Sequence, residues 1–168
     1  MAHIRYAIAS DVRAIAKIHV FSWQAIYRGH IPDDVLDNLS IDEREKLWKT
    51  LLENNASIIV LEDNNDLVGF VSFCPSRDED VNSQKIAEIS AIYLSPDKWR
   101  KGFGKMLCDA AIEELRKSDF TEVTLWVLDE NQQARQFYEK MGFINSTNFK
   151  IDVRDGYSLR EVRYRKIL

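Results

Sequence analysis

The sequence has few of the residues that build disulfide frameworks and metal sites. Only two cysteines, Cys74 and Cys108, and three histidines occur among 168 residues. The cysteines lack the spacing of metal ligands, and the histidines do not cluster with them. Disulfide scaffolds and zinc sites both require closely spaced groups of this kind. We therefore expect reduced cysteines and no metal site.

Proline and glycine are also scarce, with three and six copies respectively. No low-complexity tract or internal repeat interrupts the chain, so no interdomain linker is expected. Hydrophobic residues make up 45% of the sequence, which is enough for a sizeable core at this length. The sequence therefore predicts one domain spanning residues 1–168.

Long hydrophobic runs and an excess of positive charge are both absent. No apolar run approaches the length of a membrane span, and the segment from Met1 to Arg5 lacks the apolar core of a signal peptide. The net charge is −4 and the pI is about 5.4, whereas a nucleic-acid-binding protein needs a basic face. We expect a cytoplasmic protein with no membrane or nucleic-acid partner.

Hydrophobic periodicity predicts alternating strands and helices. Ser10 and Ser40 each precede a helical pattern, and Ser40 forms a capping-box motif with Glu43. The segment 31–36 indicates a short helical turn. The predicted strands are 4–8, 57–61, 67–74, 86–94, 121–128, 143–152 and 159–167, and the later helices are 103–118 and 131–141. The order β-α-α-β-β-β-α-β-α-β-β indicates an α/β (α+β) fold with a mixed sheet packed by helices on both faces.

The segment from Pro96 to Lys105 is the most informative part of the chain. It links a strand to the start of an amphipathic helix and contains the turn Gly-Phe-Gly. The first turn of a helix presents unpaired N–H groups and the positive end of the helix dipole, and glycine lets a ligand approach the main chain. Arg100, Lys101 and Lys105 add positive charge. These features predict a polyphosphate ligand, with a tight turn and a solvated basic rim as the alternative.

Two familiar phosphate-binding loops do not fit this segment. A Walker loop has four residues between its glycines, whereas only Phe103 separates Gly102 from Gly104. The dinucleotide fingerprint requires a third glycine at the position of Leu107.

A second motif follows the strand 121–128. It consists of Asn131, Ala134, the pair Phe137-Tyr138 and the pair Gly142-Phe143. Asn131 has the position of a helix N-cap, and Gly142 that of a C-cap glycine. This pattern resembles the GCN5-related N-acetyltransferase (GNAT) superfamily, and the Gly-Phe-Gly turn is similar to that superfamily's pyrophosphate loop. The resemblance runs from about Ile4 to the end of the chain.

The resemblance implies a seven-stranded mixed sheet whose central parallel strands splay apart, and it implies acetyl-CoA as co-substrate without a metal. The pantetheine arm would lie between those strands, and the pyrophosphate would meet the loop. The implied coenzyme-binding residues are Ile92, Tyr93, Leu94, Arg100, Lys101, Gly102, Phe103, Gly104, Lys105 and Asn131. A side chain at either loop glycine would crowd the phosphates. Asn131 could instead act only as a helix cap, and Trp99 stands where the motif usually has Gln or Arg, which leaves plain loop packing as its alternative role.

Two further residues have implied catalytic roles. In the superfamily, the tyrosine matching Tyr138 points at the thioester sulfur, and a phenol with a pKa of about 10 can protonate a departing thiolate. Glu88 lies in an Ala-Glu-Ile run similar to that of the catalytic glutamate in the histone-acetylating branch, which implies a general base. Apolar neighbours on a strand would raise its pKa. The alternatives are a half-buried helix aromatic for Tyr138 and an ion-paired or solvated carboxylate for Glu88.

The resulting hypothesis is an N-acetyltransferase in which a primary amine attacks acetyl-CoA directly, because Cys108 is expected in the core and no other nucleophile stands out. The acceptor would be a small molecule or an amine of a peptide or protein, and homodimers are common in the superfamily. Family geometry places the acceptor pocket at Phe21, Trp23, Tyr27, 75–83 and 155–157. The acidic run 78–80 either attracts a cationic amine or is a solvated loop. The alternative function is a non-catalytic acyl-CoA-binding or regulatory module.

Overall fold

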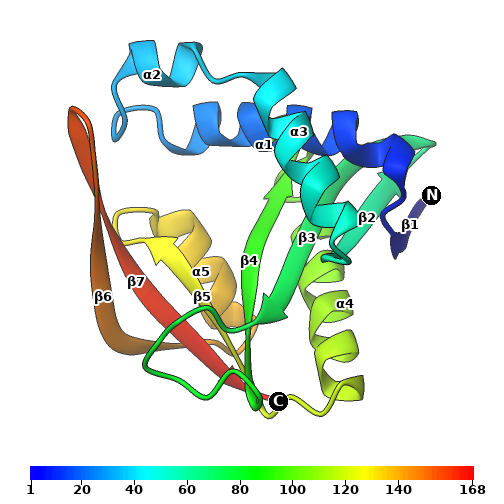
Figure 1. The fold of residues 1–168 in the computed structure, drawn as a ribbon, viewed down its shortest axis with the longest axis vertical. Coiled ribbons are helices and arrows are strands. Elements are labelled where there is room, and N and C mark those ends of the chain that lie inside the picture. The colour runs from blue at the N-terminus through cyan, green and yellow to red at the C-terminus, as the bar shows by residue number, and fades with distance from the viewer.

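The computed structural model describes residues 1–168, built around one mixed sheet of seven strands (Figure 1). The strand order is β1-β2-β3-β4-β5-β7-β6. All neighbouring strands are antiparallel except β4 and β5, which are parallel. The strands are β1 (Ala2–Tyr6), β2 (Ser57–Asp63), β3 (Asp66–Pro75), β4 (Ile86–Leu94), β5 (Glu122–Leu128), β6 (Ile144–Arg154) and β7 (Tyr157–Ile167).

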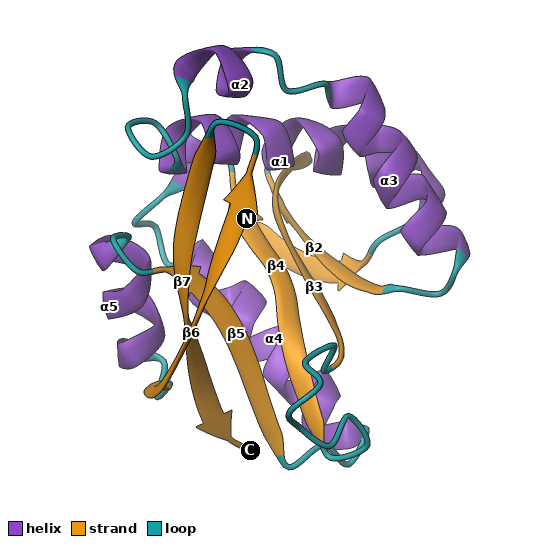
Figure 2. Cartoon of the chain, turned by 60° about the vertical axis from the view of Figure 1, so that its left-hand side comes forward, coloured by secondary structure: helices purple, strands orange, loops and turns teal.

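Helices cover both faces of the sheet, as the sequence predicts (Figures 1 and 2). The helices are α1 (Val12–Ile26), α2 (Asp33–Asp37), α3 (Ile41–Glu53), α4 (Phe103–Lys117) and α5 (Gln132–Lys140). None of the five combines the length and the hydropathy that a membrane-spanning helix requires.

The run Ile58 to Leu61 in β2 shows how the two layers form. Ile58 and Val60 pack in a cluster with α1 and α3, whereas Ile59 and Leu61 pack in the cluster that contains α4. Successive side chains of a strand point to opposite faces, so a strand buried on both sides is a continuous apolar run.

Most predicted boundaries agree with the structure to within two residues, and β4 has the predicted bounds. Ser40 caps α3 as predicted, because its Oγ accepts a hydrogen bond of 3.1 Å from the Glu43 N–H. The prediction for Ser10 is wrong. Residues Ala9–Asp11 form a 3-10 turn, and Asp11 is the N-cap residue of α1. The Asp11 carboxylate instead accepts hydrogen bonds from Arg5 and from the Ile8 N–H.

The central parallel strands separate after a short pairing. β4 and β5 pair only at Ile86, Ala87 and Glu88 of β4, whose partners are Glu122, Val123 and Thr124. Beyond this point, β4 continues along β3, and β5 continues along β7. The β3–β4 register shifts just where the separation begins, and an irregularity of this kind bends a strand. The predicted splay is therefore confirmed.

Candidate active site

The separated strands border a cavity of about 120 Å³. Its lining consists of Ile26, Tyr27, Ile89, Ser90, Ala91, Ile92, Tyr93, Leu125, Trp126, Val127, Leu128, Asn131, Ala134 and Tyr138. Because β4 pairs with β5 only as far as Glu88, the main chain on this side of β4 has no partner strand along the cavity. Unpaired strand groups can bind an extended ligand. A wider depression of about 720 Å³ on β5, β6 and β7 includes no residue of β4 or α5.

The loop before α4 presents a row of free backbone donors. The N–H groups from Arg100 through Lys105 make no hydrogen bond within the chain. Gly102 is the N-cap residue with φ of +84°, a conformation that glycine adopts without strain. Free N–H groups at the positive end of a 15-residue helix form a site suited to an anion. The loop thus has the donors that a diphosphate requires.

The two loop glycines are required for different reasons. A Cβ at position 102 would meet no atom of the chain within 4 Å, so within the chain it is the backbone conformation that favours glycine. A Cβ at position 104 would lie 3.2 Å from Cζ of Phe137. A side chain at position 104 would therefore press on an aromatic ring of α5, in addition to the crowding of the phosphates that the resemblance implies. Of the basic side chains, Lys105 is paired with Asp109 at 2.5 Å, and Arg100 and Lys101 are exposed.

The end of β4 is tied to both the loop and α1. The Leu94 carbonyl accepts hydrogen bonds from Ser22 Oγ at 2.8 Å and from Trp99 Nε1 at 3.2 Å. Both donors bond the Leu94 carbonyl, which is therefore not free to bind a ligand. Ile92 and Tyr93 line the cavity, whereas Leu94 does not. Trp99 therefore anchors the loop to the strand that precedes it.

α5 contributes two polar side chains to the cavity. Asn131 is the N-cap residue, because its Oδ1 accepts a hydrogen bond of 3.1 Å from the Ala134 N–H, and its side-chain amide donates none. Tyr138 is 9% exposed, and its hydroxyl makes no hydrogen bond. Since every fully buried side-chain polar atom has a partner, the Tyr138 hydroxyl keeps access to the cavity. Burial raises the pKa of Tyr138, so this phenol is protonated at neutral pH.

Glu88 lies at the last residue pair before the strands separate. Its side chain is 3% exposed and accepts hydrogen bonds from the Arg77 N–H at 2.7 Å, Nε at 2.9 Å and Nη2 at 3.1 Å. Burial alone would raise the pKa of Glu88, but the hydrogen bonds and charge of Arg77 outweigh burial and lower it. The expectation of a raised pKa is therefore wrong, because a cation from the neighbouring loop binds the carboxylate.

Comparison with known proteins agrees with this geometry. The model of the acetyltransferase (GNAT) family matches residues 17–143. The chain belongs to the GNAT family. It is 35% identical to the uncharacterized N-acetyltransferase YuaI of Bacillus subtilis over 96% of this chain and 91% of that protein. Membership makes it an acyl-CoA-dependent N-acetyltransferase.

The names of two more distant relatives state the molecule that each protein acylates. The L-amino acid N-acyltransferase MnaT of Escherichia coli is 25% identical over 84% of this chain and 78% of its own length. The spermidine N(1)-acetyltransferase of Thermoplasma acidophilum is 27% identical over 91% of both chains.

Solved structures share the GNAT fold along the whole chain. An N-acetyltransferase from Staphylococcus aureus aligns with a TM-score of 0.77 and 23% identity, covering 99% of this chain and 98% of that one. The yncA protein of Salmonella typhimurium, solved with acetyl-CoA, aligns with a TM-score of 0.76 and 22% identity, covering 100% and 94%. Both alignments confirm the fold.

In this GNAT protein, an aromatic wall stands at the α1 side of the cavity. Trp23 Nε1 donates a hydrogen bond of 3.0 Å to the Tyr93 hydroxyl, and the rings of Trp23 and Tyr27 lie 4.7 Å apart. His19 stacks on Tyr93 and accepts a hydrogen bond from Trp48 Nε1. Burial, aided by a nearby cation, lowers the pKa of His19 to about 4, so it is neutral at pH 7.

Of the predicted acceptor residues, Trp23 and Tyr27 contribute to this wall. Together with Tyr157 they pack against an apolar cluster formed by Ile31, Leu36, Leu128 and Leu159. Phe21 is 47% exposed and does not line the cavity.

The loop between β3 and β4 is held by specific contacts. Asp78 accepts hydrogen bonds from Trp126 Nε1 at 3.1 Å and from Arg163 at 3.1 Å, and Asp80 pairs with Arg163 at 2.7 Å. The acidic run 78–80 is therefore held by contacts within the chain and is not a simple solvated loop. Sequence reasoning missed both arginines, Arg77 and Arg163. For Arg163, the available signal was the alternation of side-chain directions along the strand β7, which places Glu161, Arg163 and Arg165 on one face.

Proposed function

We propose that this GNAT protein transfers the acetyl group of acetyl-CoA to a primary amine by direct attack, with Tyr138 as general acid and Glu88 as general base. The observation that carries the proposal is the arrangement of the cavity. The free N–H groups from Arg100 through Lys105 lie at the N-terminus of α4, the helix that follows β4. Tyr138 lines the cavity between the separated strands β4 and β5.

The donor assignment rests on the fit of these residues to a thioester of coenzyme A. The loop N–H groups would bind the pyrophosphate, and the free main chain of β4 at Ile92 and Tyr93 would bind the amides of the pantetheine arm. The free side-chain amide of Asn131 would add one donor. The Salmonella relative solved with acetyl-CoA supports the same donor.

The acceptor assignment follows from the chemistry of amines. A primary amine arrives protonated, with a pKa near that of lysine at about 10.4, and it must lose a proton before it attacks. Glu88 is buried at the end of the strand pairing and does not itself line the cavity, so it would accept that proton through a water molecule. The two relatives named for amino acids and for spermidine support an amine acceptor.

The proposed reaction conserves atoms and charge. A bond forms between the amine nitrogen and the thioester carbonyl carbon, and the carbon–sulfur bond breaks with its electron pair on sulfur. The ammonium first loses one proton to Glu88, which passes it on to solvent, and the free amine then attacks. After attack the nitrogen loses a second proton, while Tyr138 donates a proton to the leaving thiolate and recovers one from that released by the nitrogen. The products are the amide, the coenzyme A thiol and one proton in solvent. No covalent acyl-enzyme is required, because Cys108 is fully buried and burial raises the pKa of its thiol to about 12.

The central test replaces Tyr138 with phenylalanine. We expect Tyr138→Phe to lower kcat about 100-fold or more with acetyl-CoA affinity retained, because a general acid contributes roughly that factor. Release of free thiol, measured across a panel of amines, gives kcat, and calorimetry gives the affinity.

The neighbouring variant Phe137→Leu controls for packing changes in α5. Unchanged turnover in Tyr138→Phe would exclude the acid role. A wild-type protein that binds acetyl-CoA but acetylates no amine would instead support the non-catalytic module.

A further inference from the structure

Two charged side chains, Arg44 and Glu161, differ from all others that are half-buried or buried. Neither makes an ion pair or a hydrogen bond within the chain, whereas every other acidic or basic side chain that is not exposed has a partner. Withdrawing a charge from water without a partner costs free energy. Such groups are therefore expected where a ligand supplies the partner.

Both side chains lie at the aromatic wall of the acceptor side. The Arg44 guanidinium, from α3, lies 5.8 Å from the centre of the Trp23 ring. Glu161, from β7, pairs directly with Leu128, which lines the cavity, and cross-strand partners share a face.

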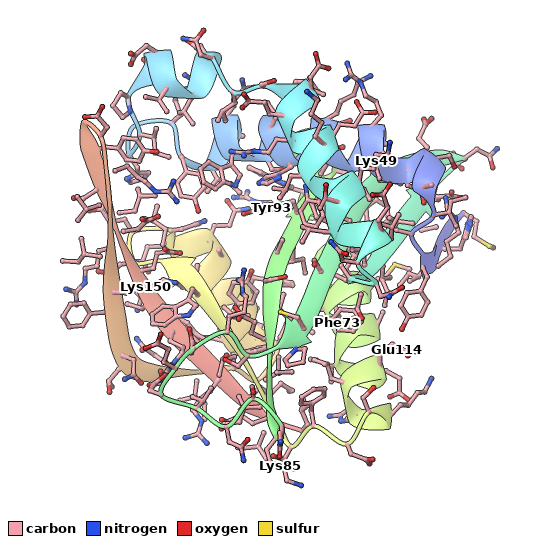
Figure 3. All side chains as sticks on the ribbon, in the orientation of Figure 1. Lys49, Phe73, Lys85, Tyr93, Glu114 and Lys150 are labelled. Atoms are coloured by element: carbon pink, nitrogen blue, oxygen red, sulfur yellow. The ribbon has the colours of Figure 1, made fainter.

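The charges of Arg44 and Glu161 both act on Tyr93. Burial raises the pKa of its hydroxyl most and the hydrogen bond from Trp23 lowers it, while the charge of Glu161 raises it and the charge of Arg44 lowers it. Figure 3 shows Tyr93 at the end of β4 nearest to α1 and α3.

The neighbours of Glu161 do not neutralise it. Lys150 is its partner in the β6–β7 register, but the Lys150 Nζ lies over the Trp126 ring, 4.3 Å from its centre. Arg154, the other cation whose charge acts on Glu161, is bonded to Asp152. Burial raises the pKa of Glu161, as expected for a carboxylate without a bound cation.

Resting on the proposed function, we infer that the acceptor is a zwitterion of the α-amino acid class, whose anionic group binds Arg44 and whose amine binds Glu161. Opposite charges on one aromatic wall complement a ligand that carries both signs. A polyamine would place a cation near the Arg44 guanidinium, which disfavours that acceptor class. Glu161 then receives the protonated amine before the proton leaves, and Trp23 and Tyr27 contact the rest of the acceptor.

The test compares α-amino acids with the amines that lack their carboxylates, such as L-leucine with isopentylamine and L-phenylalanine with phenethylamine, and adds spermidine. Thiol release from acetyl-CoA gives kcat/KM for each. We expect the wild-type protein to prefer each amino acid by about tenfold or more, since a charge-assisted hydrogen bond is worth that factor. Arg44→Gln should remove this preference and leave the simple amines unchanged. Glu161→Gln should raise KM for both classes.

Two matched control variants each remove one charge, of the same sign as Arg44 or Glu161, at an exposed site. Lys49→Gln lies on the same helix as Arg44, and Glu113→Gln lies on α4. Neither should change the preference. Retained acetyl-CoA binding and thermal unfolding would show that the Arg44 and Glu161 variants are folded.

The outcomes separate the inference from the proposed function. Simple amines or spermidine used as well as amino acids, or an Arg44→Gln variant that loses both classes equally, would overturn the zwitterion inference and leave the transferase reaction intact. Acetyl-CoA binding without acetylation of any acceptor would overturn both.

Discussion

Glu88 and Tyr138 have different electrostatic environments although both are buried. The guanidinium and N–H of Arg77 bind Glu88 and lower its pKa, whereas Tyr138 has no polar partner and burial raises its pKa. Environments that separate two pKa values in this way assign an ionised and a protonated role at one pH. The pair thus fits a base that is already ionised and an acid that is still protonated.

Arg77 should therefore control the acidic limb of the pH–rate profile. The base must be unprotonated, and its lowered pKa keeps it ionised down to acidic pH. In Arg77→Gln, burial remains while the cation is lost, so the pKa of Glu88 should rise and the acidic limb of kcat/KM should move to higher pH.

Stability should follow the same group. A carboxylate with a lowered folded pKa stabilises the protein above its unfolded pKa of about 4.3, and this contribution is lost as the pH falls through the folded value. Thermal unfolding measured as a function of pH tests this stability effect.

In the pH–rate experiment, an acidic limb of kcat/KM at the same pH in wild type and Arg77→Gln would show that Glu88 is not the titrating base.

At the scale of elements, β4 and the start of α4 work as one unit. β4 has one edge paired with β3 and the other free beyond Glu88. Ser22 and Trp99 hold the Leu94 carbonyl at its end, and the free N–H groups of the loop follow at once. A ligand bound along the strand is therefore continuous with an anion bound at the helix.

The loop conformation can be tested at Gly102. We expect Gly102→Ala to destabilise the protein by about 1 kcal/mol, because L-residues are strained in the left-handed region, and to weaken coenzyme A binding by shifting the N–H groups.

Gly156→Ala is the matched control. Gly156 has a φ of +87° and, like Gly102, has open space where a Cβ would lie. It should lose similar stability with unchanged coenzyme affinity. Denaturant unfolding and calorimetry measure both quantities, and an equal affinity in the two variants would place the pyrophosphate elsewhere.

At the scale of the molecule, the sheet has two parts, β1 to β4 and β5 to β7, which are joined by the short β4–β5 pairing and by two apolar clusters. The larger cluster joins α4 to residues of β2, β3, β5 and β7, and a smaller cluster joins Ile31 and Leu36 to Leu128 and Leu159. Figure 2 shows β4 and β5 diverging from the end at which they pair, and the gap between their separated parts contains the cavity. A ligand in this gap would contact both parts.

Coenzyme A should accordingly raise global stability. At a free concentration 100 times its Kd, the free energy of unfolding should rise by about 2.7 kcal/mol. Thermal unfolding with and without coenzyme A measures the shift, with Gly102→Ala expected to respond only at higher concentrations. No shift at saturating coenzyme A would contradict binding to the folded cleft.

Local patterns in the sequence determined the elements, the family and the glycine turn. Apolar alternation, the Ser40 cap and the Asn131 cap depend on neighbours a few residues apart, so they can be read along the chain. Packing between distant segments decided the rest. The contact of Arg77 with Glu88, the ring of Phe137 beneath Gly104, and the lack of partners for Arg44 and Glu161 all depend on tertiary distances, which no local pattern encodes.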